Sequence, residues 1–141
     1  MKLTKKSKIF LAGHRGMVGS AIYRKLIENG YKNIIVTTRK KLDLTKQKET
    51  LNFLKKIKPY FVIVAAARVG GIYANQKYKD KFIYENLQIQ NNLIHGSFLS
   101  GVKNLFLLGS SCIYPRLTKQ PMSENQLLTG SLEETNDAYA I

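Results

Sequence analysis

Residues 9–21 read IFLAGHRGMVGSA. The apolar run Ile9–Ala12 is typical of a buried parallel strand, and a helical pattern begins directly behind glycines spaced three apart. Gly13 can adopt backbone angles that a side chain forbids, Gly16 lets the main chain approach a pyrophosphate, and Gly19 allows close helix–strand packing. The N–H groups and the dipole of the helix N-terminus favour an anion. Such a triplet also occurs in ordinary turns, but its placement between strand and helix predicts the phosphate-binding turn of a dinucleotide site.

Strand-like and helical segments alternate along the 141 residues, which we interpret as one domain. We expect strands over residues 9–12, 33–38, 61–66 and 105–108. We expect helices over 17–29, from an N-cap at Thr45 to Pro59, over about 81–100 and from Asp137, with a loop over 69–80 and turns over 115–136. The apolar face of the first helix comprises Met17, Val18, Ala21, Ile22, Leu26 and Ile27. This order predicts an α/β fold with a Rossmann-type, doubly wound parallel sheet.

Composition narrows the function classes. A single cysteine, Cys112, excludes an intrachain disulfide, and with two histidines it gives no metal-ligand cluster. No apolar run is long enough for a signal peptide or a membrane span, so we expect a cytoplasmic, metal-free protein that does not associate with membranes. The net charge of +14 suits a nucleic-acid binder, but the lysines are scattered over expected solvent-facing surfaces. We therefore favour no nucleic-acid partner.

The residues after the second strand bear on cofactor choice. An NAD site places an acidic residue there to accept from the ribose hydroxyls, whereas this chain has Arg39. A guanidinium suits a 2′-phosphate, so we favour NADP(H), with Arg15 in the glycine turn as a second phosphate contact. Asp43 could accept from the adenine amino group. The alternative is that both arginines simply face water.

The fourth strand runs into Ser110-Ser111-Cys112 at the edge where ligands bind in such sheets. Either serine could hydrogen-bond a substrate carbonyl oxygen on which charge develops, and the thiol of Cys112 could act as an acid or base. Without other context, such a cysteine is more often a small buried hydrophobe and a serine pair more often a turn former.

Three longer motifs carry a resemblance to a known family. They are residues 13–21 (GHRGMVGSA), 65–72 (AAARVGGI) and 108–115 (LGSSCIYP). Residues 119–122 (KQPM) and 136–141 (NDAYAI) continue the likeness, which extends from about Ile9 to Ile141. The chain resembles the GDP-L-fucose synthases, which are extended short-chain dehydrogenase/reductases.

The resemblance implies epimerisation of GDP-4-keto-6-deoxy-D-mannose at carbons 3 and 5, followed by NADPH-dependent reduction at carbon 4. Ser110 would bind the keto oxygen, Tyr139 would donate a proton to it, and Cys112 would be one epimerisation acid/base. The cofactor would contact the glycine turn and the ends of the second and third strands. By motif position those residues are Gly13, Arg15, Gly16, Met17, Val18, Gly19, Arg39, Asp43, Leu44, Ala65 and Ala66.

The family's YxxxK lysine would fall two residues beyond Ile141. We therefore expect residues 1–141 to be the N-terminal part of an NAD(P)-binding Rossmann domain, truncated after the fourth strand. The remaining strands and the substrate domain would be absent, turnover would be lacking, and apolar surface would lie exposed. The family's homodimer pairs the helix over 81–100 with the one that begins near Tyr139. Alternatives are another sugar-nucleotide reductase or epimerase of this superfamily, such as a dTDP-4-dehydrorhamnose reductase, or a non-catalytic nucleotide-binding remnant.

Overall fold

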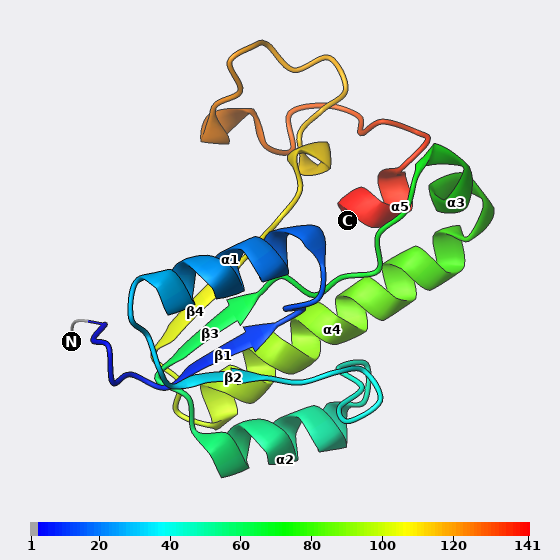
Figure 1. The fold of residues 1–141 in the computed structure, drawn as a ribbon. Coiled ribbons are helices and arrows are strands. Elements are labelled where there is room, and N and C mark those ends of the chain that lie inside the picture. Colours follow the sequence, from blue (N-terminus) through cyan, green and yellow to red (C-terminus); the bar gives the residue numbers. More distant parts are fainter. Residues whose placement is uncertain (1–2) are drawn as a thin grey trace. The chain divides into compact units, whose positions relative to one another are not determined.

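A computed structural model describes residues 3–141, which form two compact units (Figure 1). The first, here called the sheet unit, comprises the residues up to Ala67 together with Leu87–Leu108. The second, here called the loop unit, comprises Arg68–Asn86 and Gly109–Ile141. Within residues 3–141, no helix combines the length and hydropathy needed to cross a bilayer.

Four parallel strands form the sheet: β1 (Ile9–Ala12), β2 (Ile34–Val36), β3 (Phe61–Val64) and β4 (Asn104–Leu107). Their spatial order is β2-β1-β3-β4, so the chain reverses its direction of winding between β1 and β3. This confirms the predicted α/β, Rossmann-type doubly wound sheet. In such sheets the ligand crevice opens at the reversal, beyond the carboxyl ends of the strands.

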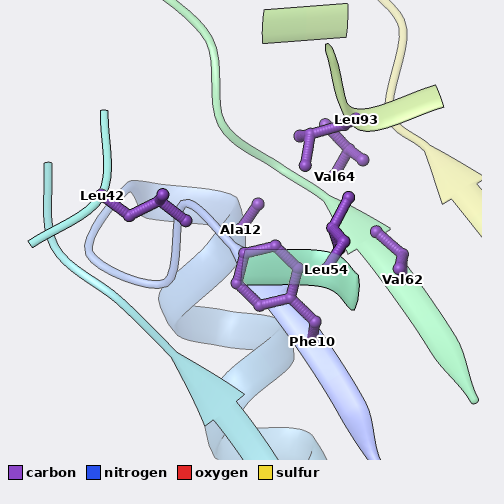
Figure 2. Packing of buried hydrophobic residues seen from close by; sticks show 7 residues of the cluster. All are labelled: Phe10, Ala12, Leu42, Leu54, Val62, Val64 and Leu93. Atoms are coloured by element: carbon purple, nitrogen blue, oxygen red, sulfur yellow. The ribbon is translucent and has the colours of Figure 1, made fainter. Parts of the chain in front are cut away.

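The two faces of the sheet are covered by different helices. Phe10, Ala12, Val62 and Val64 alternate with Ile9, Leu11 and Ile63 because successive strand side chains point to opposite faces. The first set packs against Leu54 of α2 (Gln47–Ile57) and Leu93 of α4 (Lys79–Leu99) (Figure 2). The second set packs against residues of α1 (Met17–Glu28) and β2. The core of the sheet unit therefore consists of two apolar layers, one on each side of β1 and β3.

Two details of the helices differ from expectation. Ile22 and Leu26 of α1 pack on the sheet with Tyr23, whereas Met17, Val18, Ala21 and Ile27 are exposed. Gly19 is the buried residue of this helix, and the contact face is therefore rotated toward it. Thr45 is not the N-cap of α2; that residue is Lys46, because the hydroxyl of Thr45 donates to Asp43 Oδ1 at 2.8 Å.

The expected loop over 69–80 contains a helix, α3 (Ile72–Lys77), and α4 begins at Lys79 and ends at Leu99. Six residues make fewer than two turns, too few for apolar periodicity to reveal α3. The rest of the loop unit is turn-rich as predicted, with single 3₁₀ turns η1 (Ser111–Ile113) and η2 (Glu124–Gln126) before α5 (Asp137–Ala140). Strand β4 lies at the sheet edge, where Phe106 is 51% exposed.

Candidate cofactor and active site

Two of the three glycines after β1 are required by the fold itself. Gly13 has φ +89°, and a Cβ placed there would lie 2.5 Å from the carbonyl oxygen of Ala65. A Cβ on Gly19 would overlap the carbonyl of Gly13 and come within 3.1 Å of the Cα of His14. The end of β1, the end of β3 and the first turn of α1 thus approach one another as closely as backbone allows.

Gly16 is different, because nothing in the described chain requires a glycine there. Its angles, φ −73° and ψ 167°, suit any residue, and an added Cβ would meet only the Gly13 oxygen at an ordinary 3.5 Å. It is the N-cap of α1, no side chain caps that end, and the first turn has no acidic residue. The space above Gly16 is therefore open to an anionic ligand at the positive end of a twelve-residue helix.

The other predicted residues of this turn surround the same helix end. Arg15 is exposed and has no ion pair or hydrogen bond to residues 3–141, and Met17 and Val18 are 87% and 47% exposed. Arg15 can therefore turn toward a bound phosphate without breaking an internal contact.

In the turns that follow β2, Asp43 is held by local hydrogen bonds. Its Oδ1 accepts from the backbone N–H and the hydroxyl of Thr45 at 3.0 and 2.8 Å. Partial burial raises the pKa of Asp43, but the Thr45 hydrogen bonds and the charges of Arg39 and Lys46 outweigh burial, so the pKa lies below its usual value. Asp43 is therefore ionised at neutral pH, and the positive charge of Arg39 contributes to its lowered pKa.

Leu44 and the alanines after β3 are placed by the sheet unit. The side chain of Leu44 packs against the core, and its carbonyl accepts from Asn92 Nδ2 at 2.9 Å. The N–H of Ala65 donates to the Ala12 carbonyl at 2.9 Å, continuing the β1–β3 ladder past the end of β3. Ala66 packs beside the same core. Ala65 and Ala66 therefore lie half-buried directly after β3, at the reversal point of the sheet.

The loop unit holds the three predicted catalytic residues. Ser110 is the N-cap of η1, and its Oγ accepts from the N–H of Cys112 at 3.2 Å. Cys112 is half-buried, and its Sγ accepts from Nδ2 of Asn136 at 3.2 Å. Asn136 is the N-cap of α5, the short helix that carries Tyr139. The side chain of Asn136 thus links the thiol of Cys112 to α5, the helix that carries Tyr139.

Helix α5 is fixed by side chains from the start of α4. The ring of Tyr139 meets the buried ring of Phe82 edge-on, with centroids 6.3 Å apart. Lys79 Nζ pairs with Asp137 Oδ1 at 2.7 Å and also donates to the Glu134 carbonyl at 3.1 Å. The hydrogen bond from Lys79, together with the one from the Ala138 N–H, lowers the pKa of Asp137.

The structure therefore brings Ser110, Cys112 and Tyr139 into one unit, where η1 and α5 pack together, and brings the predicted cofactor residues into the other. Sequence reasoning missed Asn136 as a neighbour of the thiol. In the described part of the chain, no group of three or more His, Cys, Asp and Glu is arranged to hold a metal ion.

Residues 9–141 match the NAD dependent epimerase/dehydratase family, from the first residue of β1 to Ile141, directly after α5. The chain belongs to this family. The match includes the glycine turn, the β3 end, η1 and α5, so every predicted site residue lies within it.

Relatives within this epimerase/dehydratase family give more detail. The chain is 56% identical over 137 residues to GDP-L-fucose synthase 1 of Arabidopsis thaliana and 48% identical over 136 residues to the GDP-L-fucose synthase of Escherichia coli strain K12. It covers 42% of the length of each, and 97% and 96% of this chain are aligned.

A solved structure agrees in fold. The GDP-mannoheptose C4 reductase of Campylobacter jejuni with NADP bound is 40% identical and superposes with a TM-score of 0.94, covering 99% of this chain and 44% of that one. The chain thus spans less than half of the epimerase/dehydratase proteins that it matches.

Proposed function

We propose that residues 1–141 are the N-terminal part of the NADP(H)-binding domain of a GDP-L-fucose synthase. The observation that carries this proposal is the packing of η1 against α5, which places Ser110, Cys112 and Tyr139 in one unit. The 48–56% identity to GDP-L-fucose synthases of a plant and a bacterium supports the same conclusion.

The glycine turn fits a dinucleotide. The open position above Gly16, the uncapped first turn of α1 and the exposed Arg15 suit the pyrophosphate. Arg39 suits the 2′-phosphate that distinguishes NADP from NAD, and Asp43 and Leu44 would line the adenosine side with Ala65 and Ala66. When bound, NADPH supplies the hydride for reduction at carbon 4 of the sugar.

Residues near η1 and in α5 would polarise the keto group of the sugar and so make its carbon a better hydride acceptor. Ser110 would hydrogen-bond the oxygen at carbon 4, and Tyr139 would donate its phenolic proton as negative charge develops on that oxygen. The edge-on contact with Phe82 fixes the ring of Tyr139 from the side. The serine and tyrosine thus share one task, stabilisation of an oxyanion.

Cys112 would exchange protons at a carbon beside the ketone. That ketone acidifies the hydrogens at carbons 3 and 5, since removal of either gives an enolate. Inversion at one carbon needs a proton taken from one face and returned on the other, so a second acid/base group is required. We propose that this group lies in a segment corresponding to the unaligned remainder of the relatives, since the chain covers 42% of the length of the Arabidopsis relative.

A chimera tests the proposal directly. Residues 1–141 replace the corresponding part of the E. coli relative, which supplies the rest of the protein. We expect NADPH oxidation that depends on GDP-4-keto-6-deoxy-D-mannose and a GDP-L-fucose product. Tyr139→Phe should lower kcat by about a hundredfold or more. A folded chimera that oxidises no NADPH with this substrate but reduces another sugar nucleotide would favour a different reductase of the family.

NADP preference has its own test in the chain of residues 1–141. Arg39→Ala should weaken NADPH binding about tenfold or more while leaving NADH binding nearly unchanged, since the 2′-phosphate contact is charge-assisted. Fluorescence titration of the bound dihydronicotinamide measures both, and Lys119→Ala, another exposed cation, is the control. Equal losses for both cofactors would place Arg39 away from the 2′-phosphate.

We further propose that the whole protein is a cytoplasmic homodimer that uses α4 at its interface. The exposed apolar side chains Tyr84, Ile94 and Phe98 of this helix support it, with exposures of 63%, 42% and 76%. Phe98→Glu in the chimera should give a monomer by light scattering, whereas an unchanged dimer would show that the interface does not depend on this side chain.

If residues 1–141 bind NADPH but the chimera has no activity, the non-catalytic nucleotide-binding alternative is favoured.

A further inference from the structure

We propose that Asn136 is a positioning residue for the acid/base chemistry of Cys112. Its side-chain amide can donate a hydrogen bond to the thiolate and accept one from the thiol. This inference rests on the proposed function, in which Cys112 exchanges protons with the sugar.

The contact joins two parts of the sequence that are 24 residues apart. Asn136 Nδ2 donates to Cys112 Sγ at 3.2 Å, within hydrogen-bond range for sulfur. The backbone of Cys112 is held separately, since its N–H donates to Ser110 Oγ at 3.2 Å. Backbone and thiol are thus held by different side chains, so a change at Asn136 acts on the sulfur itself.

The other end of the amide supports a role in proton exchange. Asn136 Oδ1 is buried and has no hydrogen-bond partner within residues 3–141. A buried carbonyl oxygen without a donor is costly, and nothing else fixes which end of the carboxamide faces the sulfur. The N–H end stabilises a thiolate, and a half-turn of the amide brings Oδ1 to accept from an S–H. A thiol that gives or takes a proton in each turnover exists both as thiol and as thiolate during the cycle, and this amide offers a partner to each of the two states.

The charged neighbours on the packed elements are already paired. Helix α5 carries Asp137 and Tyr139, and η1 carries no ionisable side chain besides Cys112. Asp137 is bound by Lys79 Nζ at 2.7 Å and by the Ala138 N–H at 2.7 Å, and Tyr139 packs on Phe82. Among these residues, Asn136 is the one whose side chain makes a hydrogen bond to Cys112 Sγ.

The test uses the fact that Cys112 is the sole cysteine of the sequence. The rate of iodoacetamide alkylation of residues 1–141 is measured against pH, and its midpoint reports thiolate formation. Asn136→Ala removes the donor to the thiolate and should raise the midpoint by about one unit. Asn136→Asp has the same shape but places an anion beside the sulfur, and should raise it further. Circular dichroism establishes that each variant is folded.

Asn125→Asp is the matched control, because it adds the same charge to an exposed asparagine of the loop unit that does not contact the thiol. The control should leave the midpoint within about 0.2 units of the parent. The inference is overturned if Asn136→Asp shifts the midpoint no more than Asn125→Asp. Should Asn136→Ala fail to fold, the isosteric Asn136→Asp variant decides alone.

Deuterium incorporation from D₂O into the sugar separates this inference from the proposed function. In the chimera, Cys112→Ser should abolish exchange at one of the two carbons, and Asn136→Asp should slow exchange there at least tenfold and shift its pH profile upward. Full exchange in Cys112→Ser would refute the role of the thiol in the proposed function. Normal exchange in Asn136→Asp, with exchange lost in Cys112→Ser, would refute the role of Asn136 alone.

Discussion

The two units of the chain are stabilised by different forces. Ten of the twelve buried apolar side chains of residues 3–141 lie in the sheet unit, and the loop unit has only Phe82 and Ala140. The loop unit has the ion pairs Arg68–Glu85, Lys79–Asp137 and Arg116–Glu133, and side-chain amides hydrogen-bonded to backbone and sulfur. The sheet unit also has polar contacts, such as the exposed pair Lys25–Glu28, but they accompany its apolar core. The predicted cofactor-binding turn is thus supported by an apolar core, whereas the predicted catalytic residues are held mainly by polar contacts.

This difference predicts unequal local stability. Apolar burial stabilises the sheet unit roughly in proportion to area, whereas partly exposed ion pairs contribute little. The loop unit should open more readily and exchange its amide hydrogens faster than β1 and β3.

The largest effect is expected in the core of the sheet unit. Leu54 is fully buried between α2 and the sheet, so Leu54→Ala should cost about 2–5 kcal/mol of the free energy of unfolding. Urea unfolding followed by circular dichroism measures this loss. The control Leu117→Ala, 93% exposed in the loop unit, should change it by less than about 0.5 kcal/mol. A similar loss in both variants would remove the contrast between the units.

The glycines of the predicted cofactor-binding turn should divide into two kinds. Gly19→Ala forces a Cβ into the Gly13 carbonyl, and should cost about 1–3 kcal/mol through displaced backbone. Gly16→Ala should leave the free energy of unfolding within about 1 kcal/mol and weaken NADPH binding tenfold or more, because its Cβ occupies the open space over the helix end. Unfolding and NADPH titration of both variants separate the cases. Equal NADPH affinity in Gly16→Ala would show that the phosphates bind elsewhere.

The fold of the sheet unit could be predicted because its signals are local. Apolar runs bounded by glycine or proline mark β1 and β3, and α1 ends before Gly30, which has φ +77°. Errors occurred where tertiary contacts decide. Thr45 was predicted as an N-cap, but its hydroxyl is taken by Asp43, and the exposed Met17 and Val18 were expected on the buried face of α1.

The motifs of the candidate site can be read from the sequence, but the contacts between its residues cannot. The glycine spacing and the Ser110–Cys112 motif are visible in the sequence, and the family match includes them. The bond between Asn136 and Cys112 spans 24 residues of turn-rich chain, and Asn86 binds the backbone of Arg68 across 18 residues. Neither contact follows from the periodicity of a helix or a strand, so only the folded structure reveals these pairs.

The next effect concerns the polar contacts of the loop unit. Asn86 accepts from the Arg68 N–H at 2.6 Å and donates to the Arg68 carbonyl at 3.0 Å, fixing the chain after β3. Asn86→Ala should cost about 1–3 kcal/mol, since both backbone groups lose their partner in a part-buried place. Hydrogen exchange of residues 68–86 should rise while β1 and β3 stay protected. Asn91→Ala, exposed on the same helix, is the control. Uniformly faster exchange in both units would indicate that they unfold as one.

The smallest effect concerns Asp137, whose pKa is lowered by the hydrogen bond from Lys79. A carboxylate with a lowered pKa stabilises the folded state above its unfolded value, 3.8, and this contribution is lost as the pH falls through the lower folded value. Because the pair is about two-fifths exposed, its contribution should be small. Lys79→Met should return the titration of Asp137, followed by carbon NMR of its carboxyl group, toward 3.8, and should remove the associated decline of the melting temperature in acid. As a control, Lys119→Met should change neither the titration of Asp137 nor the dependence of the melting temperature on pH, if both effects come from the Lys79–Asp137 pair. An unchanged titration in Lys79→Met would leave the Ala138 N–H as the cause, and α5 would then depend on its own backbone rather than on α4.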